Sequence, residues 1–365
     1  MKFSVPAYYD TKYIDVIKDE HLPVHGIYGS HAYTLTGSGR CGSILPKVSD
    51  KQFSDFVSYT RQNDIDFYYT YNSSELALKE YSNTFYNEFM SDVSKQIKSG
   101  VNGFSIAIPM LLDWIKREYP DVKVYVSSFA RIRTVAMAQY WHKLGADTIY
   151  LEEANRDFGL IRALAREGYD LEVLVNESCI WDCPYRGWHF NTNSMGSQKD
   201  TIMKGYPLPM FYCGVEVLND PLKWFTGEWI RPEDLEFYEK NGVKNFKLSG
   251  RNKSMDELLQ LIRVYASRKF DGNLLDIIGS RRAYVPQQMS DGKLAEQFEV
   301  LATARIDNSL FPSDYIQQIS RRECGRITCE KCGYCKSVAD KVMTIGGKPL
   351  SEYQSPNAKV PIYVV

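Results

Sequence analysis

Two cysteines four positions apart, Cys179 and Cys183, lie in the segment ESCIWDCPYRGWHF (177–190), and an arginine and a histidine follow closely. Thiols at this spacing could form a disulfide, hold zinc, hold an iron–sulfur cluster or provide a nucleophile. Arg186 could bind a carboxylate in bidentate fashion, and His189 could move protons near neutral pH. Both could equally serve the structure alone, Arg186 by pairing with an acidic residue and His189 by capping a loop.

A second group of cysteines lies near the end of the chain, in ECGRITCEKCGYCKSV (323–338). Its members, spaced C-x4-C-x2-C-x2-C, are Cys324, Cys329, Cys332 and Cys335. Zinc sites usually separate two cysteine pairs by a loop, whereas this compact run is closer to a ferredoxin-type ligand set. We therefore expect a second 4Fe-4S cluster here, with zinc as the alternative, serving electron transfer or acting as a structural staple.

The composition is that of a soluble globular protein: 365 residues, of which 44% are hydrophobic and 24% charged. The formal net charge of -1 lacks the basic excess typical of nucleic-acid binders, so such a partner is not expected. No apolar run approaches a membrane span and the first ten residues lack a signal-peptide core, so we expect a cytoplasmic protein. In that compartment eight cysteines indicate metal ligation or redox chemistry rather than disulfides.

Short β-branched or aromatic segments alternate with helical ones along most of the chain. The eight expected strands are 2–8, 24–30, 66–72, 103–109, 123–128, 147–153, 171–177 and 245–251. Such alternation implies parallel strands with crossover helices, and eight units close a barrel. The predicted fold is an α/β, (β/α)8 TIM-like barrel over residues 1–285. A small Cys-rich appendage, residues 286–365, would follow, and a metal centre would help it fold.

Active sites of such barrels lie at the carboxyl ends of the strands. Polar and aromatic residues expected at this mouth are Ser30, Arg40, Tyr69, Tyr71, Ser127, Ser128, Arg131, Arg133, Glu152, Glu153, Ser249 and Arg251. Cys41 follows the second strand, the Cys179/Cys183 pair follows the seventh, and Cys213 lies in the long insertion before the eighth. Four thiols would thus converge on one mouth, which fits either zinc or a 4Fe-4S cluster.

Three runs carry a resemblance to a known family: residues 106–154 with a Ser-Ser strand end and a Leu-Gly-Ala turn, LEVLVNESCIWDCPYR (171–186) and FKLSGRNKSMDELLQLIRVY (246–265). In order and spacing they resemble the U32 peptidase-like family, which includes the anaerobic ubiquinone-biosynthesis hydroxylases. The resemblance covers residues from about 85 to 270, about half the chain. The chain departs from the family pattern because it lacks the usual Gly-Arg-Cys shortly after the first cluster cysteine.

The resemblance implies a 4Fe-4S cluster in the barrel. Cys179 and Cys183 match cluster cysteines of the family, Cys41 is similar to an early ligand of one branch, and Cys213 resembles the late ligand of another. The implied activity is an oxygen-independent, hydroxylase-like oxidation of a small carboxylated or aromatic molecule, with prephenate as an oxygen donor in some members. An electron donor and a homo- or heterodimeric arrangement are the implied partners.

Within this expectation, the residues assigned catalytic roles are Glu152, Arg186, His189 and Arg251. The residues assigned to substrate binding are Arg40, Arg131, Tyr185 and Lys247. Two alternatives remain: a hydrolase with cysteine-bound zinc, as the family name suggests, or a non-catalytic electron-transfer subunit. The sequence contains no evident Ser-His-Asp, HExxH or paired-aspartate constellation, which weighs against the hydrolase.

Overall fold

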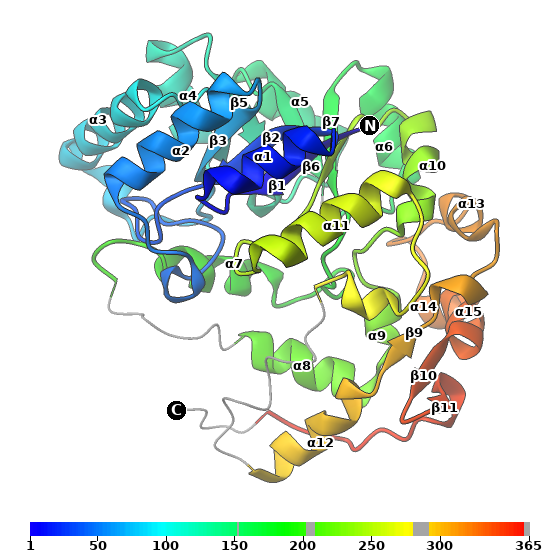
Figure 1. Cartoon of the computed structure of the whole chain (residues 1–365). Coiled ribbons are helices and arrows are strands. Elements are labelled where there is room, and N and C mark those ends of the chain that lie inside the picture. The colour runs from blue at the N-terminus through cyan, green and yellow to red at the C-terminus, as the bar shows by residue number, and fades with distance from the viewer. Residues whose placement is uncertain (152, 202–208, 280–291, 361–365) are drawn as a thin grey trace.

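Eight parallel strands pair in chain order and close into a barrel in the computed structural model, which describes residues 1–151, 153–201, 209–279 and 292–360 (Figure 1). The strands are β1 (Lys2–Pro6), β2 (Val24–Gly29), β3 (Asp66–Tyr71), β4 (Gly103–Ile106), β5 (Lys123–Val126), β6 (Thr148–Leu151), β7 (Asp170–Leu174) and β8 (Asn245–Lys247). Each lies within one of the predicted strand segments or starts one residue before it. The predicted (β/α)8 barrel is therefore confirmed.

Helices follow the strands and cover the outside of the barrel. They are α1 (Thr11–Asp19), α2 (Asp50–Gln62), α3 (Asn83–Lys98), α4 (Pro109–Glu118), α5 (Val135–Lys143), α6 (Phe158–Arg166), α7 (Arg186–Met195), α10 (Leu235–Lys240) and α11 (Met255–Ser267). Local chemistry explains several starts, since Ser49 and Ser254 form capping boxes with Gln52 and Glu257. Helix α3 begins only at Asn83, because Leu78 before it adopts a left-handed conformation and Ser82 caps the helix.

Three buried tyrosines, Tyr28, Tyr68 and Tyr125, pack together across the barrel interior, and the rings of Tyr68 and Tyr125 lie 4.0 Å apart. Room for them comes from Gly26, where a Cβ would lie 2.3 Å from the Tyr68 ring. Side chains alternate along a strand, so the neighbours Tyr69 and Tyr71 point outward into the helix layer. They contact Phe53 and Phe89 there, and the expectation that they line the mouth was wrong.

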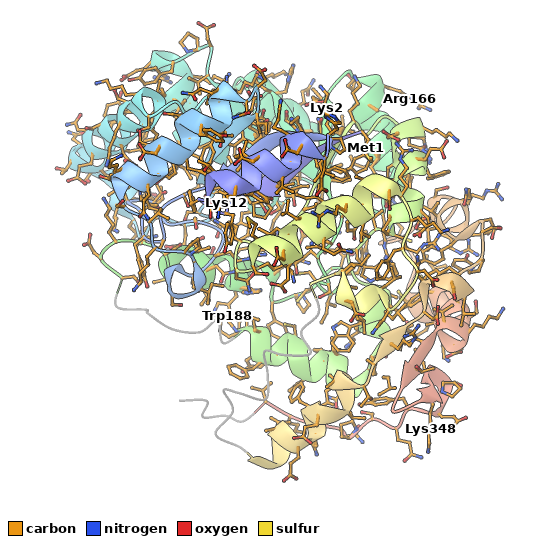
Figure 2. The ribbon with its side chains drawn as sticks, in the orientation of Figure 1. Met1, Lys2, Lys12, Arg166, Trp188 and Lys348 are labelled. Carbon is orange, nitrogen blue, oxygen red and sulfur yellow. The ribbon has the colours of Figure 1, made fainter. Side chains whose placement is uncertain are left out.

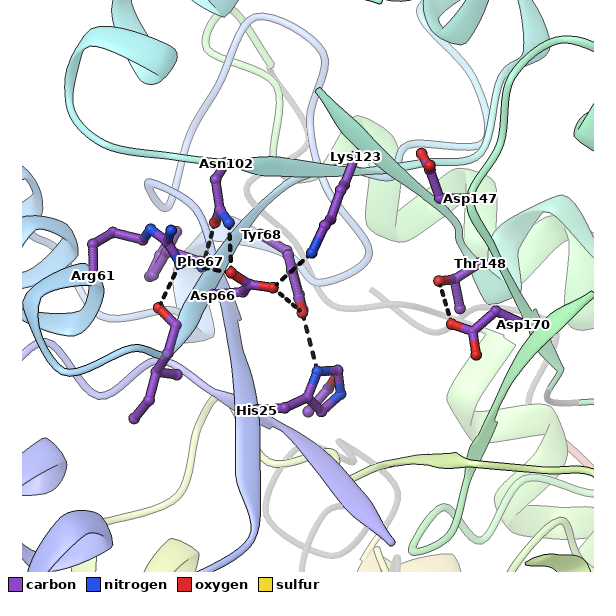
Figure 3. A network of polar contacts seen from close by, with 12 residues as sticks. His25, Arg61, Asp66, Phe67, Tyr68, Asn102, Lys123, Asp147, Thr148 and Asp170 are labelled. Carbon is purple, nitrogen blue, oxygen red and sulfur yellow. Dashed lines mark hydrogen bonds and ion pairs between the residues drawn. The ribbon is translucent and has the colours of Figure 1, made fainter. Parts of the chain in front are cut away.

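A polar network closes the opposite end of the barrel, at the amino ends of the strands (Figure 3). Asp66 accepts hydrogen bonds from Asn102 at 2.6 Å and Lys123 at 3.1 Å. Burial raises the pKa of the Asp66 carboxyl, but these bonds outweigh it and hold the pKa below its ordinary value. His25 lies within hydrogen-bond distance of Ser4 and Tyr68, and burial lowers the pKa of its imidazole. This end stabilises the fold, as is general for such barrels.

The C-terminal segment packs against the insertion between β7 and β8. The insertion contains α8 (Pro209–Asn219) and α9 (Leu222–Phe225), and the tail contains α12 (Gly292–Ala302), α13 (Tyr315–Ser320), α14 (Cys329–Cys332), α15 (Tyr334–Val342) and the sheet β11–β10–β9 (Lys348–Pro349, Met343–Ile345, Arg305–Ile306). Figure 1 shows these elements grouped on one side of the barrel.

The apolar core runs without interruption from the barrel into this tail. Phe225 stacks on Phe311 with ring centroids 5.6 Å apart, and Trp229 packs edge-on against the same ring. The tail therefore has apolar support from the barrel in addition to any metal. The predicted boundary between residues 285 and 286 lies outside the described residues. Among the described helices, none has the length and apolar character that a membrane crossing requires.

Candidate active site at the barrel mouth

A cavity of about 200 Å³, called the mouth cavity below, opens at the carboxyl ends of the strands. Three cationic side chains line it, Arg40, Lys247 and Arg251, as the sequence predicted. Its other walls are mainly aromatic and hydroxylic, from Tyr28, Ser127, Ser128, Phe129, Tyr150, Phe190 and Ser249. Tyr28 of β2 and Tyr150 of β6 thus supply an aromatic floor, and Lys247 of β8 contributes to the cationic rim above it.

In the part of the chain that the structure describes, carboxylates lie close to two of the three cations at the mouth. Arg40 forms an ion pair with Glu177 at 3.1 Å, and the Lys247 ammonium lies 3.9 Å from Glu172. Among the described residues, Arg251 donates to the hydroxyl of Ser38 at 3.5 Å, and no carboxylate lies within 4.0 Å of it. Burial, with the Arg40 charge nearby, lowers the pKa of Arg251 to about 10. An anion entering this cavity would relieve that unfavourable charge.

Lys247 also lies over two aromatic faces, 4.1 Å from the Tyr28 ring centroid and 4.8 Å from that of Tyr150. These contacts hold the ammonium above the floor of the cavity, because a ring face attracts a cation. A small acid with an aromatic or apolar body would therefore meet rings below and cations at the rim.

Three of the four predicted barrel cysteines, Cys179, Cys183 and Cys213, line a second, smaller cavity beside the mouth, called the thiol cavity. The fourth, Cys41, lines the mouth cavity instead, and its thiol lies 3.4 Å from the amide oxygen of Asn193. Cys179 and His189 line both cavities, so they form the wall between them. Burial raises the pKa of the Cys41 thiol, opposed by the Arg40 charge. Three of the four predicted cysteines thus line the thiol cavity, whereas Cys41 lines the adjacent mouth cavity.

Arg186 and Arg131 take part in a buried ion-pair network below α7. Arg186 donates to Glu228 at 2.5 Å, and its Nε lies 3.7 Å from Glu153. Glu153 also accepts from Arg131 at 3.0 Å. Arg186 still borders the thiol cavity, but Arg131, predicted to bind substrate, is directed to Glu153 and lines neither cavity. Glu152, the other carboxylate predicted here, lies outside the described residues.

Tyr185, the remaining predicted substrate residue, borders the thiol cavity rather than the mouth cavity. Its ring packs 5.0 Å from Tyr212 of α8, which in turn meets Trp188 at 5.7 Å. Trp188 is exposed over 44% of its surface and lies at the outside of the molecule (Figure 2). Tyr185 therefore links the thiol cavity to an aromatic group at the surface.

The tail cysteines Cys324, Cys329, Cys332 and Cys335 all line one cavity of about 380 Å³, called the tail cavity. Burial raises the pKa of Cys324 and Cys329, and that of Cys335 to about 11, while the Arg156 charge opposes each rise. Trp181 and Asp182, from the loop between the barrel cysteines, line the same cavity. All four tail thiols thus line the same cavity.

Both thiol sets have the chemistry of a soft-metal site, because cysteine supplies the ligand atoms. Among the described residues that line the two cavities, Asp182 is the one carboxylate. Within the described ranges, however, no group of three or more His, Cys, Asp or Glu side chains has its ligand atoms already arranged to hold an ion. Metal binding would require the thiols to converge. This is usual where the metal itself completes the site.

Several site residues were not predicted from the sequence. Tyr28 and Tyr150 follow from strand alternation once the barrel register is known, and Glu177 is the first residue of the cysteine-containing segment quoted above. Glu228 carried no signal, because it reaches Arg186 from the insertion, 42 positions along the chain.

Fold and cavities define the protein as a cysteine-rich (β/α)8 barrel with a thiol-lined mouth. No family model matches the chain. An uncharacterized protease of Methanocaldococcus jannaschii is 26% identical over 324 residues, which cover 85% of this chain and 86% of that protein. Among solved structures, the U32 peptidase Mk0906 shares the fold with a TM-score of 0.51 and 19% identity, over 68% of this chain and 93% of that one. The chain is thus similar in sequence to an uncharacterized protease and in fold to a U32 peptidase.

Proposed function

We propose that this protein is an iron–sulfur-dependent, oxygen-independent oxidoreductase of hydroxylase type that acts on a small carboxylated molecule at the barrel mouth. The observation that carries the proposal is the shared wall of the two cavities. Cys179 and His189 face both the cation-lined mouth and the thiol cavity. A substrate held by the cations would lie directly beside the thiols.

The chain's own residues would divide the work as follows. Arg40 and Arg251 bind the carboxylate, since guanidinium groups pair with carboxylates in bidentate fashion. Tyr28 and Tyr150 support the body of the substrate and exclude water from below. His189 stands at the shared wall, where an imidazole can accept or return a proton near neutral pH.

Cys179, Cys183 and Cys213 would hold the cluster, and Cys41 is the candidate for the fourth ligand because it shares the mouth cavity with Cys179. When bound, a 4Fe-4S cluster supplies one-electron redox chemistry. Arg186, fixed by Glu228 and Glu153, anchors the start of α7 behind these thiols.

A second candidate function is a hydrolase that uses cysteine-bound zinc, and the names of the relatives favour it, since one is a protease and the other a U32 peptidase. A Ser–His pair does exist, Ser4 and His25 at 3.1 Å, but it lies at the amino ends of the strands. Ser4 is 1% exposed, so a peptide does not reach it there.

The deciding experiment is the iron, sulfide and zinc content of the full chain after anaerobic purification, compared with the Cys179→Ala/Cys183→Ala variant. The proposal expects the variant to lose about four irons and four sulfides relative to the unmodified protein, as one 4Fe-4S cluster requires. Zinc in place of iron, together with peptide cleavage in air, would reject the oxidoreductase and establish the hydrolase. A Ser127→Ala variant, changed at the mouth but not at a thiol, is the control for metal content.

A further inference from the structure

The thiol cavity and the tail cavity lie on opposite sides of one short loop. Cys179, Ile180 and Cys183 line the thiol cavity, whereas the intervening Trp181 and Asp182 line the tail cavity. Neighbouring residues of a single segment thus face different thiol sets. This one segment therefore forms part of the wall of both cavities.

This loop, residues 179–183, is held firmly from both sides. The carbonyl of Ile180 accepts from Arg186 at 3.2 Å, and the carbonyl of Cys179 accepts from the backbone of Glu228 at 3.0 Å. On the tail side Asp182 adopts a left-handed conformation, φ 50°, and forms an ion pair with Arg133. A rigid loop fixes the separation of whatever the two sets of thiols bind.

The barrel also contributes a buried cation to the tail cavity. Arg156, from the loop after β6, is 6% exposed and lines that cavity together with the four cysteines. It stacks 5.1 Å from the Trp229 ring and donates to the Trp229 carbonyl at 3.1 Å. No carboxylate of the described residues lies within 4.0 Å of it, although a buried charge usually requires a partner. A metal centre bound by four thiolates carries net negative charge and would supply that partner.

We propose that Cys324, Cys329, Cys332 and Cys335 bind a 4Fe-4S cluster that passes single electrons to the barrel site across the loop 179–183. The electron-transfer part rests on the proposed function, since it requires a cluster in the barrel. One electron enters from a low-potential iron–sulfur carrier protein and reduces the tail cluster from 2+ to 1+. That cluster returns to 2+ as the barrel cluster goes from 2+ to 1+, and no bond is made or broken.

The first test uses the anaerobically purified full chain in three forms: unmodified, Cys179→Ala/Cys183→Ala and Cys329→Ser/Cys332→Ser. The inference expects about eight irons in the unmodified protein and about four in each variant. After reduction with dithionite, electron paramagnetic resonance should show spin–spin broadening in the unmodified protein. Each variant should give a simple, unbroadened signal, because only one centre remains.

The outcomes separate the two proposals. Zinc in the Cys179→Ala/Cys183→Ala variant would refute the tail cluster while leaving the proposed function intact. Four irons in that variant and no more in the unmodified protein would refute the barrel cluster, and with it the proposed function and the electron transfer. Eight irons without spin–spin broadening would refute the transfer across the loop.

Arg156 offers an independent readout of the tail centre. Arg156→Met should shift the midpoint potential of the tail cluster to lower values, because a nearby positive charge stabilises the more negative reduced state. Arg156→Lys, which keeps the positive charge, should have a midpoint potential close to that of the unmodified protein. It distinguishes loss of the charge from a folding defect. Arg326→Met is the matched control: Arg326 lines the same cavity but is 63% exposed, so solvent screens its charge. Equal potentials in both Met variants would overturn the placement of the centre beside Arg156.

Discussion

Replacing Arg251 with methionine should stabilise the folded protein, because no carboxylate of the described residues pairs with this guanidinium at the mouth. Burial and the Arg40 charge lower its pKa from the ordinary arginine value to about 10. At about 1.36 kcal/mol per pKa unit the charged form is disfavoured by at most about 3 kcal/mol. The side chain is only half-buried, so solvent screening reduces the expected gain to about 1–2 kcal/mol.

Urea unfolding of the unmodified protein and the Arg251→Met variant measures this gain, read as a higher midpoint at unchanged slope. Arg131→Met is the matched control and should destabilise, because Arg131 neutralises the buried Glu153. A residue whose loss stabilises a protein is characteristic of a binding site held ready for its ligand.

The same variants test anion binding directly. Benzoate, a small aromatic carboxylate, should raise the melting temperature of the unmodified protein but not that of Arg251→Met, whereas the neutral analogue benzamide should affect neither. At a benzoate concentration ten times its Kd, binding should add about 1.4 kcal/mol to the free energy of unfolding. A destabilised Arg251→Met variant, or equal stabilisation of both proteins by benzoate, would refute the interpretation of the cationic rim as an anion site.

Three further predictions concern the framework. Gly26→Ala should lower the free energy of unfolding in urea by about 2 kcal/mol or more, because the new Cβ would overlap the Tyr68 ring. A loss below about 0.5 kcal/mol would contradict the packing described for the barrel interior. The free energy of unfolding should fall as the pH drops below about 6.5, because burial lowers the folded-state pKa of His25 and the unfolded chain binds the extra proton. His25→Gln should flatten this pH dependence in unfolding curves measured between about pH 5 and 8. Glu228→Gln should cost about 3 kcal/mol because it removes a charged partner of buried Arg186, whereas Glu236→Gln, which breaks an exposed pair with Lys240, should leave the unfolding midpoint unchanged. Equal midpoints for these two variants would show that the Arg186 network is not structural.

The barrel could be predicted because its signal is local. Alternating strands and helices, with caps such as Ser49 and Ser254, give the order of elements, and eight parallel units have one common closed arrangement. Which side of a strand faces inward was not predicted, and for this reason Tyr69 and Tyr71 were placed at the mouth while Tyr68 was overlooked. A shift of one residue in register exchanges the two faces of a strand.

The site was predicted in part for a similar reason. Lys247 ends β8, and Arg40, Arg251 and Cys179 follow strand ends, so topology alone places them at the mouth. Arg131 also follows a strand end, but its own backbone is left-handed, with φ 53°, and its side chain pairs with Glu153. Pairings across the fold, such as Arg186 with Glu228, depend on how the insertion packs, and no local pattern in the sequence encodes them.

The three tyrosines that fill the barrel interior close the mouth cavity at its lower end. Tyr28 lines the cavity from below, and Tyr68 and Tyr125 continue the layer toward the polar end of the barrel. A molecule that reacts above this layer has to leave on the side from which it came. Product still bound therefore prevents the next substrate from entering, so product and substrate should compete for the free protein. Turnover would then depend on how readily the cationic rim releases a product that keeps its carboxylate.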